Sequence, residues 1–318
     1  MQPGTACVPA HWRYADLRPL LLRASGLISK RDAERRVLML ENPGLTGTTF
    51  IAASLFAGLQ IILPGEIALS HRHSPNALRF VIEGEGAYTA VAGERIPMHP
   101  GDFIATPNWA WHDHGNDGPG PVVWMDGLDT PFAAFFGAMF REDHPRETQP
   151  LSHPPGDSAA RFGTAMLPPD HRPGAGAGTP LLCYPYARSR EALDALARGG
   201  APHPAHAYRL RYANPATGGH PFPTMAVFMQ WLPRGFAGHP WRSTESTVYN
   251  VVEGRGRAFV GGRPLDWEPH DVFVVPPWES CRFDCEAGSV LFSYSDRAAQ
   301  EALGFWREEV PAADPQRP

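Results

Sequence analysis

The stretch Val81-Ile82-Glu83-Gly84-Glu85-Gly86 is matched, 170 positions later, by Val251-Val252-Glu253-Gly254-Arg255-Gly256. A second stretch, Pro100 to Pro107, is matched by Pro269 to Pro276 at a shift of 169 positions. Two matches in the same order and at nearly the same spacing indicate an internal repeat. We therefore expect two copies of one structural unit.

The residues around both copies are typical of short β-strands. Between residues 48 and 130, apolar runs are separated about every 8 to 14 residues by turn signals such as Leu63-Pro64-Gly65 and Ala92-Gly93-Glu94. The 32 glycines and 35 prolines of the chain suit such turns. The sequence predicts a mainly β protein with two antiparallel barrels.

Composition excludes several classes of protein. The chain has 318 residues, 43% of them hydrophobic and 19% charged, which describes a soluble globular protein. Its net charge of −5 gives no indication of nucleic-acid or membrane binding, and no apolar run is long enough to cross a bilayer. The four scattered cysteines are expected to be reduced thiols, so a cytoplasmic location is expected.

Two histidine pairs carry the strongest chemical signal. They are His71-Arg72-His73 and His112-Asp113-His114, and each lies in a run that reads as β-strand. Alternate residues of a strand share one face, so the two histidines of a pair point the same way. Three imidazoles that converge inside a barrel form a metal site with open coordination positions. Strand geometry alone does not say whether His112 or His114 is the third ligand.

The repeat provides an internal control for the histidines. If they served the fold, the second copy would need them too, but its equivalent positions hold other residues. The pairs are His71 and Trp241, His73 and Ser243, Arg79 and Tyr249, His112 and Cys281, and His114 and Phe283. We therefore expect chemistry in the first copy only.

We divide the chain into five segments on the basis of the repeat and of the histidines found only in its first copy. We expect an N-terminal helical segment (1–44), a catalytic barrel (45–141), a Pro/Gly-rich connection with a short helix (142–219), a second barrel without metal ligands (220–298) and a C-terminal tail (299–318).

Strand parity also predicts what lines the first barrel. Arg79 shares the face of His71 and His73, and a buried guanidinium needs an anion, either a substrate carboxylate or a neighbouring acid such as Glu83. Asp126 is a candidate partner for Arg79, or a turn residue. Phe56, Gly58 and Gln60 share a face on the preceding strand, where the glycine would leave room for an aromatic ring.

These residues resemble the two motifs of the cupin family. The first motif fits Gly65, His71 and His73, and the second fits Gly101, Pro107, His112 and Asn116. The resemblance implies a bicupin of two jelly-roll barrels, with His112 as the third metal ligand and His114 near the substrate. Two departures stand out: Ala77 and Leu78 replace the usual glutamate, and Trp109 replaces a glycine.

The missing glutamate changes the electrostatics that we expect. Three neutral imidazoles leave the charge of a divalent ion uncompensated, so an anionic, bidentate substrate is favoured. A carboxylate and an adjacent phenolate oxygen would take two of the remaining positions, and O2 would take the last. This set describes ring cleavage of a 2-hydroxybenzoate.

Longer stretches are similar to gentisate 1,2-dioxygenase and its salicylate-cleaving relatives. They include Phe56–Gln60, Ala77–Phe80, Glu83–Val91, Trp111–Asn116, Thr244–Tyr249 and Glu301–Gly304. The resemblance implies a ferrous, usually tetrameric enzyme that inserts both oxygen atoms of O2 between C1 and C2. It also implies substrate-holding roles for Arg35, Gln60, Arg79, His114 and Asp126.

Because of Phe56, the sequence does not decide which 2-hydroxybenzoate is the substrate. Gentisate enzymes commonly have tyrosine there, whose hydroxyl would serve the 5-hydroxyl group of gentisate. We expect conversion of gentisate to maleylpyruvate, with salicylate, 5-nitro- or 5-halosalicylate and 1-hydroxy-2-naphthoate as alternatives. The sequence does not separate iron from manganese. Two other classes remain as distant alternatives: a non-catalytic cupin that binds a small acid, and a metal-dependent isomerase or decarboxylase.

Overall fold

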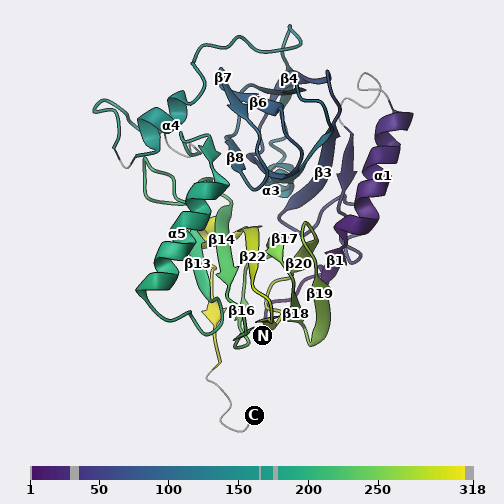
Figure 1. Cartoon of the computed structure of the whole chain (residues 1–318), viewed down its shortest axis with the longest axis vertical. Helices are drawn as coiled ribbons and strands as arrows, with labels where there is room; N and C mark the ends of the chain where they lie inside the picture. The colour runs from purple at the N-terminus through teal and green to yellow at the C-terminus, as the bar shows by residue number, and fades with distance from the viewer. Residues whose placement is uncertain (1, 29–35, 165, 175–177, 312–318) are drawn as a thin grey trace.

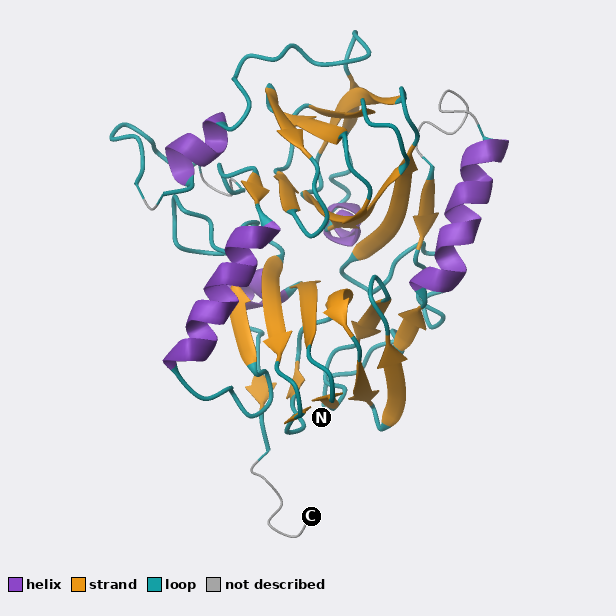
Figure 2. Ribbon diagram, in the orientation of Figure 1, coloured by secondary structure: helices purple, strands orange, loops and turns teal. Residues whose placement is uncertain are grey.

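The computed structural model describes residues 2–28, 36–164, 166–174 and 178–311. Figure 1 shows two β-barrels stacked along the long axis of the molecule, with the first barrel above the second. Helices α1, α4 and α5 lie on the flanks of the molecule (Figure 2), and the strand pairings within the described residues are antiparallel. The predicted mainly β architecture of two antiparallel barrels is therefore confirmed.

Two facing sheets form the first barrel. One has the strand order β12-β8-β5-β10-β3-β2 and the other has the order β11-β4-β9-β6-β7. Their strands are β2 (Val37–Met39), β3 (Phe56–Ile62), β4 (Ile67–His73), β5 (Ala77–Glu83), β6 (Ala87–Val91), β7 (Glu94–Pro97), β8 (Phe103–Thr106), β9 (His112–Asn116), β10 (Val122–Leu128), β11 (Arg141–Asp143) and β12 (Cys183–Tyr184).

The second barrel repeats this plan. Its sheets have the strand orders β1-β20-β17-β22-β14-β13 and β15-β21-β18-β19, and β16 pairs separately with β23. The strands are β1 (Ala10–Trp12), β13 (Tyr208–Arg211), β14 (Ala226–Leu232), β15 (Phe236–Ala237), β16 (Arg242–Ser243), β17 (Thr247–Gly254), β18 (Gly256–Val260), β19 (Arg263–Trp267), β20 (Val272–Val275), β21 (Cys281–Cys285), β22 (Ser289–Ser295) and β23 (Glu308–Glu309).

The helices also come in equivalent pairs. Helix α1 precedes β2 and α5 precedes β13, and Figure 1 places them on opposite flanks of the molecule, while α3 and α6 follow β10 and β22. Within the described ranges, no helix is long and apolar enough to cross a membrane. The helices are α1 (Tyr14–Leu27), α3 (Thr130–Phe135), α4 (Asp157–Phe162), α5 (Tyr186–Gly199) and α6 (Arg297–Leu303).

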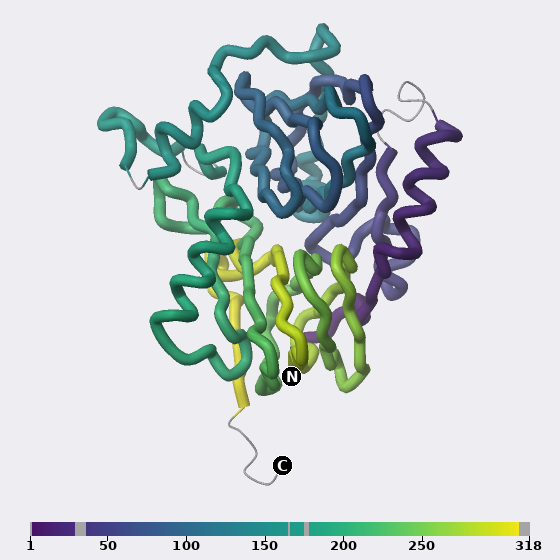
Figure 3. The backbone as a smooth tube through the Cα atoms, viewed as in Figure 1, coloured from purple at the N-terminus to yellow at the C-terminus, as the bar shows by residue number. Residues whose placement is uncertain are grey.

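Each half of the chain contributes an edge strand to the barrel formed mainly by the other half. β1 pairs with β20 of the second barrel, and β12 pairs with β8 of the first. Figure 3 shows the purple N-terminal segment running beside the green strands of the second barrel. Two aspartates at equivalent positions of the repeat, Asp102 and Asp271, hold these edge segments in place. Asp271 accepts a hydrogen bond from the backbone N–H of Tyr14, and Asp102 accepts one from the backbone N–H of Tyr186, each at 2.8 Å. Each carboxylate satisfies a donor at a helix N-terminus.

The two barrels share one hydrophobic core, which fixes their relative position. The rings of Phe80 and Phe292 stack with centroids 4.1 Å apart. Tyr294 of the second barrel donates its hydroxyl hydrogen to the carbonyl oxygen of Phe56 at 2.6 Å. A Cβ added to Gly127 would lie 2.7 Å from the Tyr294 ring, so the close approach of the barrels requires glycine there.

Three of the expected segments contain more regular structure than the sequence pattern indicated. Segment 1–44 holds β1 and β2 as well as helix α1, because both short strands complete sheets formed elsewhere in the chain. The connection 142–219 contributes helix α4 and strands β12 and β13 in addition to its predicted helix, α5. Segment 299–318 holds most of α6 and then β23, which pairs with β16.

Candidate metal centre and substrate site

Three of the four paired histidines converge inside the first barrel. His71 and His73 lie on β4 and His112 lies on β9, where His71 and His112 are direct cross-strand partners. A register shift between Ala68 and His71 marks an irregularity of the kind that re-aims side chains near functional sites. Their candidate ligand atoms all lie within 4.8 Å of one another, and all three residues are buried.

The hydrogen bonds of these histidines fix which nitrogen faces the centre. The Nδ1 atoms of His71, His73 and His112 lie 2.9, 2.8 and 2.9 Å from the carbonyl oxygens of Leu69, Pro75 and Ala110. A carbonyl oxygen only accepts, so each Nδ1 carries the proton and each Nε2 presents a lone pair. Metal-bound histidines are oriented in the same way. The residues therefore fit a divalent transition metal.

Trp109 occupies a backbone conformation that explains why glycine is usual at this position. Its φ is +60°, in the left-handed region. Its N–H donates to the carbonyl oxygen of His73 at 2.8 Å, which connects this loop to the end of β4. The guanidinium of Arg72 lies 4.6 Å from the Trp109 ring centroid, so an exposed cation–π contact holds the side chain.

His114 lies in the same interior but outside the cluster of three. Its ring centroid is 6.1 Å from that of His112 and 5.3 Å from that of Trp124. Only 1% of its surface is exposed. Between the two inward histidines, Asp113 points outward and accepts from the N–H of Gln149 at 2.9 Å, while burial raises the pKa of its carboxyl group. The alternation predicted from strand parity is observed here.

Arg79 is buried, with 2% of its surface exposed, and its nearest acid is Asp126. These two residues are cross-strand partners on β5 and β10, and Arg79 Nε lies 3.5 Å from Asp126 Oδ1. Arg79 Nη1 also donates to Thr106 Oγ1. Glu83, the alternative partner considered from the sequence, instead pairs with Arg18 at 2.8 Å. Asp126 therefore holds the Arg79 guanidinium inside the barrel, an arrangement suited to binding a carboxylate.

Gln60 and Gly58 face the same interior from β3. Gln60 is opposite Trp124 and Gly58 is opposite Asp126 in the β3–β10 ladder. A Cβ added to Gly58 would lie 2.5 Å from Val37 Cγ1 and 3.2 Å from the Phe56 ring. Val37 and the Phe56 ring therefore already occupy the space beside Gly58, which the sequence had suggested would leave room for an aromatic ring. Arg35, the remaining predicted substrate residue, lies outside the described residues.

Sequence reasoning missed one member of this polar network, Thr106, while Trp124 shares the strand parity of Asp126. Thr106 is fully buried and receives the Arg79 hydrogen bond, and Trp124 donates from Nε1 to Asp126 Oδ1 at 3.0 Å. The repeat contains a signal for Thr106. This polar residue aligns with the apolar Val275 of the second copy, the same kind of difference that distinguishes the histidines. Trp124 and Asp126 are two residues apart on β10, so strand parity places them on one face, and the structure adds the hydrogen bond between them.

The second barrel uses the equivalent positions for packing. Trp241 and Cys281 form the cross-strand pair that His71 and His112 form in the first barrel. Tyr249, the counterpart of Arg79, stacks on Phe273 with ring centroids 4.8 Å apart. These side chains belong to a buried apolar cluster. The same scaffold therefore holds polar, metal-compatible residues in one barrel and a hydrophobic filling in the other.

Two antiparallel barrels, with three convergent histidines in only one of them, define a two-barrel cupin with a single candidate metal centre. Comparison with known proteins agrees: the family profile "Cupin domain" matches residues 58–128. The chain is 48% identical to gentisate 1,2-dioxygenase 1 of Aquipseudomonas alcaligenes, over 96% of this chain and 88% of the relative. The chain belongs to the gentisate 1,2-dioxygenase family of ring-cleaving dioxygenases.

Other relatives differ in the substrate for which they are named. A 5-aminosalicylate 1,2-dioxygenase of a Comamonas species is 34% identical over 98% of this chain and 84% of its own length. A solved variant of salicylate 1,2-dioxygenase from Pseudoaminobacter salicylatoxidans, in complex with gentisate, superposes with a TM-score of 0.93 at 34% identity, covering 98% of this chain and 88% of that chain. The family resemblance predicted from the sequence is confirmed.

Replacing a proposed ligand tests the division among the four histidines. We expect His71→Ala and His112→Ala to weaken Fe(II) binding by more than about 100-fold, because each removes one of three donors. His114→Ala is the matched control, since it removes a buried imidazole from the same strand and should retain the metal. Metal content after anaerobic loading and desalting is the measurement. Metal loss in His114→Ala with retention in His112→Ala would reverse the assignment.

Proposed function

We propose that this enzyme is an Fe(II)-dependent 1,2-dioxygenase that cleaves the ring of a 2-hydroxybenzoate. The observation that carries the proposal is the cluster of His71, His73 and His112, three neutral donors buried in one barrel. A ferrous ion bound there would supply a site for chelating the substrate carboxylate and hydroxyl and for activating O2. The C1–C2 bond breaks, and both oxygen atoms of O2 enter the product.

The surrounding residues would bind and orient the substrate. Arg79 would pair with the carboxylate, while Asp126 and Thr106 hold the guanidinium in place. His114 would donate to or exchange a proton with the substrate hydroxyl group. Gln60 would offer its amide, and we also assign Arg35 and Gly58 to the substrate-binding residues. Because Arg79, His114 and Gln60 are buried, they would act in an environment with little water, which strengthens their electrostatic effect.

Gentisate is the substrate that we propose first, with maleylpyruvate as its product. The 48% identity to a gentisate 1,2-dioxygenase supports this choice. Phe56 argues for a broader range, because its ring borders Gly58 and offers no hydroxyl group to a 5-hydroxyl substituent. Salicylate, 5-substituted salicylates and 1-hydroxy-2-naphthoate are therefore the second group of candidates.

Oxygen uptake across a panel of 5-substituted 2-hydroxybenzoates tests this function. Anaerobically reconstituted Fe(II) protein should consume one O2 per ring opened, and the Mn(II) protein tests the choice of metal. In Phe56→Tyr, we expect kcat/KM for gentisate to rise relative to 5-chlorosalicylate by about tenfold, the effect of one added hydrogen bond. Phe56→Leu is the control for a changed ring. No O2 uptake with any compound would refute the proposal, as would anaerobic turnover.

We also propose that the chain forms a homotetramer. Large apolar side chains are exposed on and beyond α3: Phe135, Phe136 and Phe140 are 83%, 72% and 65% exposed. Contiguous exposed aromatic side chains of this kind mark protein interfaces. Sedimentation velocity should give four chains per particle, and Phe136→Ser should reduce this number. A monomer at micromolar concentration would contradict the assembly.

A further inference from the structure

We propose that the second barrel carries a binding site of its own, for a small organic carboxylate with an apolar body. The site is a pocket of about 670 Å³ between the end of α5, the edge strand β13 and the C-terminal segment around β23. The residues that carry the argument are Arg209, Arg297, His206, Glu308, Phe228 and Leu196. None of them belongs to the proposed metal or substrate site.

Arg209 is the group that requires an anion. It lines the pocket, and its Nε and Nη2 atoms are buried without a hydrogen-bond partner among the described residues. Buried guanidinium nitrogens without partners are costly, and a carboxylate satisfies Nε and Nη2 together through two parallel hydrogen bonds. The guanidinium carbon lies 3.8 Å from the centroid of the Phe228 ring, which holds its plane in place.

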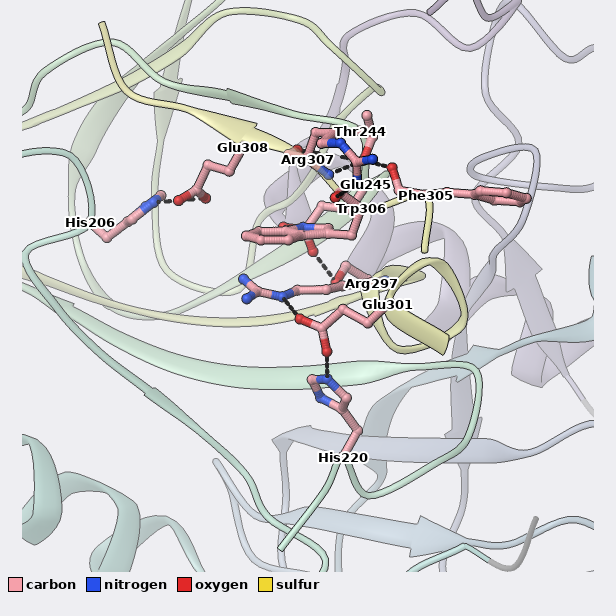
Figure 4. A network of polar contacts seen from close by, with 11 residues as sticks. His206, His220, Thr244, Glu245, Arg297, Glu301, Phe305, Trp306, Arg307 and Glu308 are labelled. Atoms are coloured by element: carbon pink, nitrogen blue, oxygen red, sulfur yellow. Dashed lines mark hydrogen bonds and ion pairs between the residues drawn. The ribbon is translucent and has the colours of Figure 1, made fainter. Parts of the chain in front are cut away.

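The charges around Arg209 favour an anion. Three arginines line the pocket, Arg209, Arg211 and Arg297, and Glu308 is its one acidic lining residue in the described part of the chain. Figure 4 shows Glu308 turned toward His206, with Nε2 and Oε2 3.2 Å apart. Burial lowers the pKa of His206, so its neutral ring donates to the Glu308 carboxylate. The hydrogen bond from His206 lowers the pKa of Glu308, and so do the nearby charges of Arg209 and Arg297. Glu308 therefore offsets part of the arginine charge, but it does not supply the hydrogen bonds that Arg209 Nε and Nη2 lack.

Apolar side chains also line the pocket. Leu196 comes from α5 and Phe228 from β14. In Figure 4 the Trp306 ring lies along Arg297, with the guanidinium carbon 3.8 Å from the ring centroid, and Arg297 also pairs with Glu301 at 2.7 Å. Arginines and apolar side chains that line one pocket match a carboxylate that carries a hydrocarbon or aromatic body.

The internal repeat places this pocket where the first barrel has its proposed substrate residues. Arg209 is opposite Gln230 on β14, as Val37 is opposite Gln60 on β3. Phe228 occupies the position equivalent to Gly58, two residues before the glutamine in each copy. The second barrel has therefore exchanged a glycine and a valine for an aromatic ring and a guanidinium. The mouth of the second barrel therefore has a cation at the position that holds Val37 in the first barrel.

The test uses the full chain and 4-fluorobenzoate, a carboxylate without the ortho hydroxyl group that metal chelation needs. Equilibrium dialysis with ¹⁹F NMR counts the molecules bound per chain. We expect wild type to bind one molecule more than Arg209→Gln, whose affinity at this pocket should fall by about tenfold or more. Arg209→Lys keeps the cation and should bind with intermediate affinity. Fluorobenzene, which lacks the carboxylate, should not bind at this pocket.

Two controls make the outcome decisive. Arg263→Gln removes an exposed arginine of β19 outside the pocket, so it changes the net charge equally and should bind like wild type. A thermal unfolding curve for each variant identifies any general loss of folding. If Arg209→Gln does not fold, Phe228→Leu is a second variant that removes a side chain lining the pocket. Equal stoichiometry and affinity in wild type and Arg209→Gln would overturn the proposal. Arg209 is not among the proposed metal and substrate residues of the first barrel, so the metal-site proposal stands or fails separately.

Discussion

Three hydrogen bonds from imidazole to backbone set the chemistry of the first barrel. In His71, His73 and His112, Nδ1–H donates to a carbonyl oxygen two residues away, so each ring turns Nε2 toward the barrel interior. All three donors are neutral, and the sequence has Ala77 and Leu78 where a fourth, acidic ligand would stand. The metal's charge is then left for the substrate to balance. The buried Arg79–Asp126 pair lies in the same interior.

The duplicated scaffold shows how one fold separates stability from chemistry. The ladder that joins His71 to His112 also joins Trp241 to Cys281, so the strand pairing is kept while the side chains change. Each half also completes the other barrel with an edge strand, fastened by Asp102 and Asp271. The apolar second barrel thus supports a first barrel whose interior is polar. A shared core, including the Phe80–Phe292 stack, couples them.

The sequence predicted the barrels and the shared face of each histidine pair from local periodicity, and it predicted the repeat from two stretches that match about 170 positions apart. It did not predict the strands β1 and β2, since three-residue edge strands have no periodic signal and form only when a sheet accepts them. The sequence did not identify the ion-pair partner of Arg79. Strand parity predicts which face of the sheet a side chain occupies, but not which residue of the neighbouring strand lies opposite it. The observed ladder places Asp126 opposite Arg79, and Gly58 proved to be bordered by Val37 and Phe56.

The neutral ligand set is the central claim, and a change of ligand charge tests it most directly. His73→Glu would place a carboxylate on the metal while keeping three donors. Metal content should persist, and anaerobic titration with salicylate should show affinity at least about tenfold weaker than in wild type, because the added negative charge replaces the one that the substrate supplies. Unchanged salicylate affinity in a metal-loaded His73→Glu protein would contradict the account.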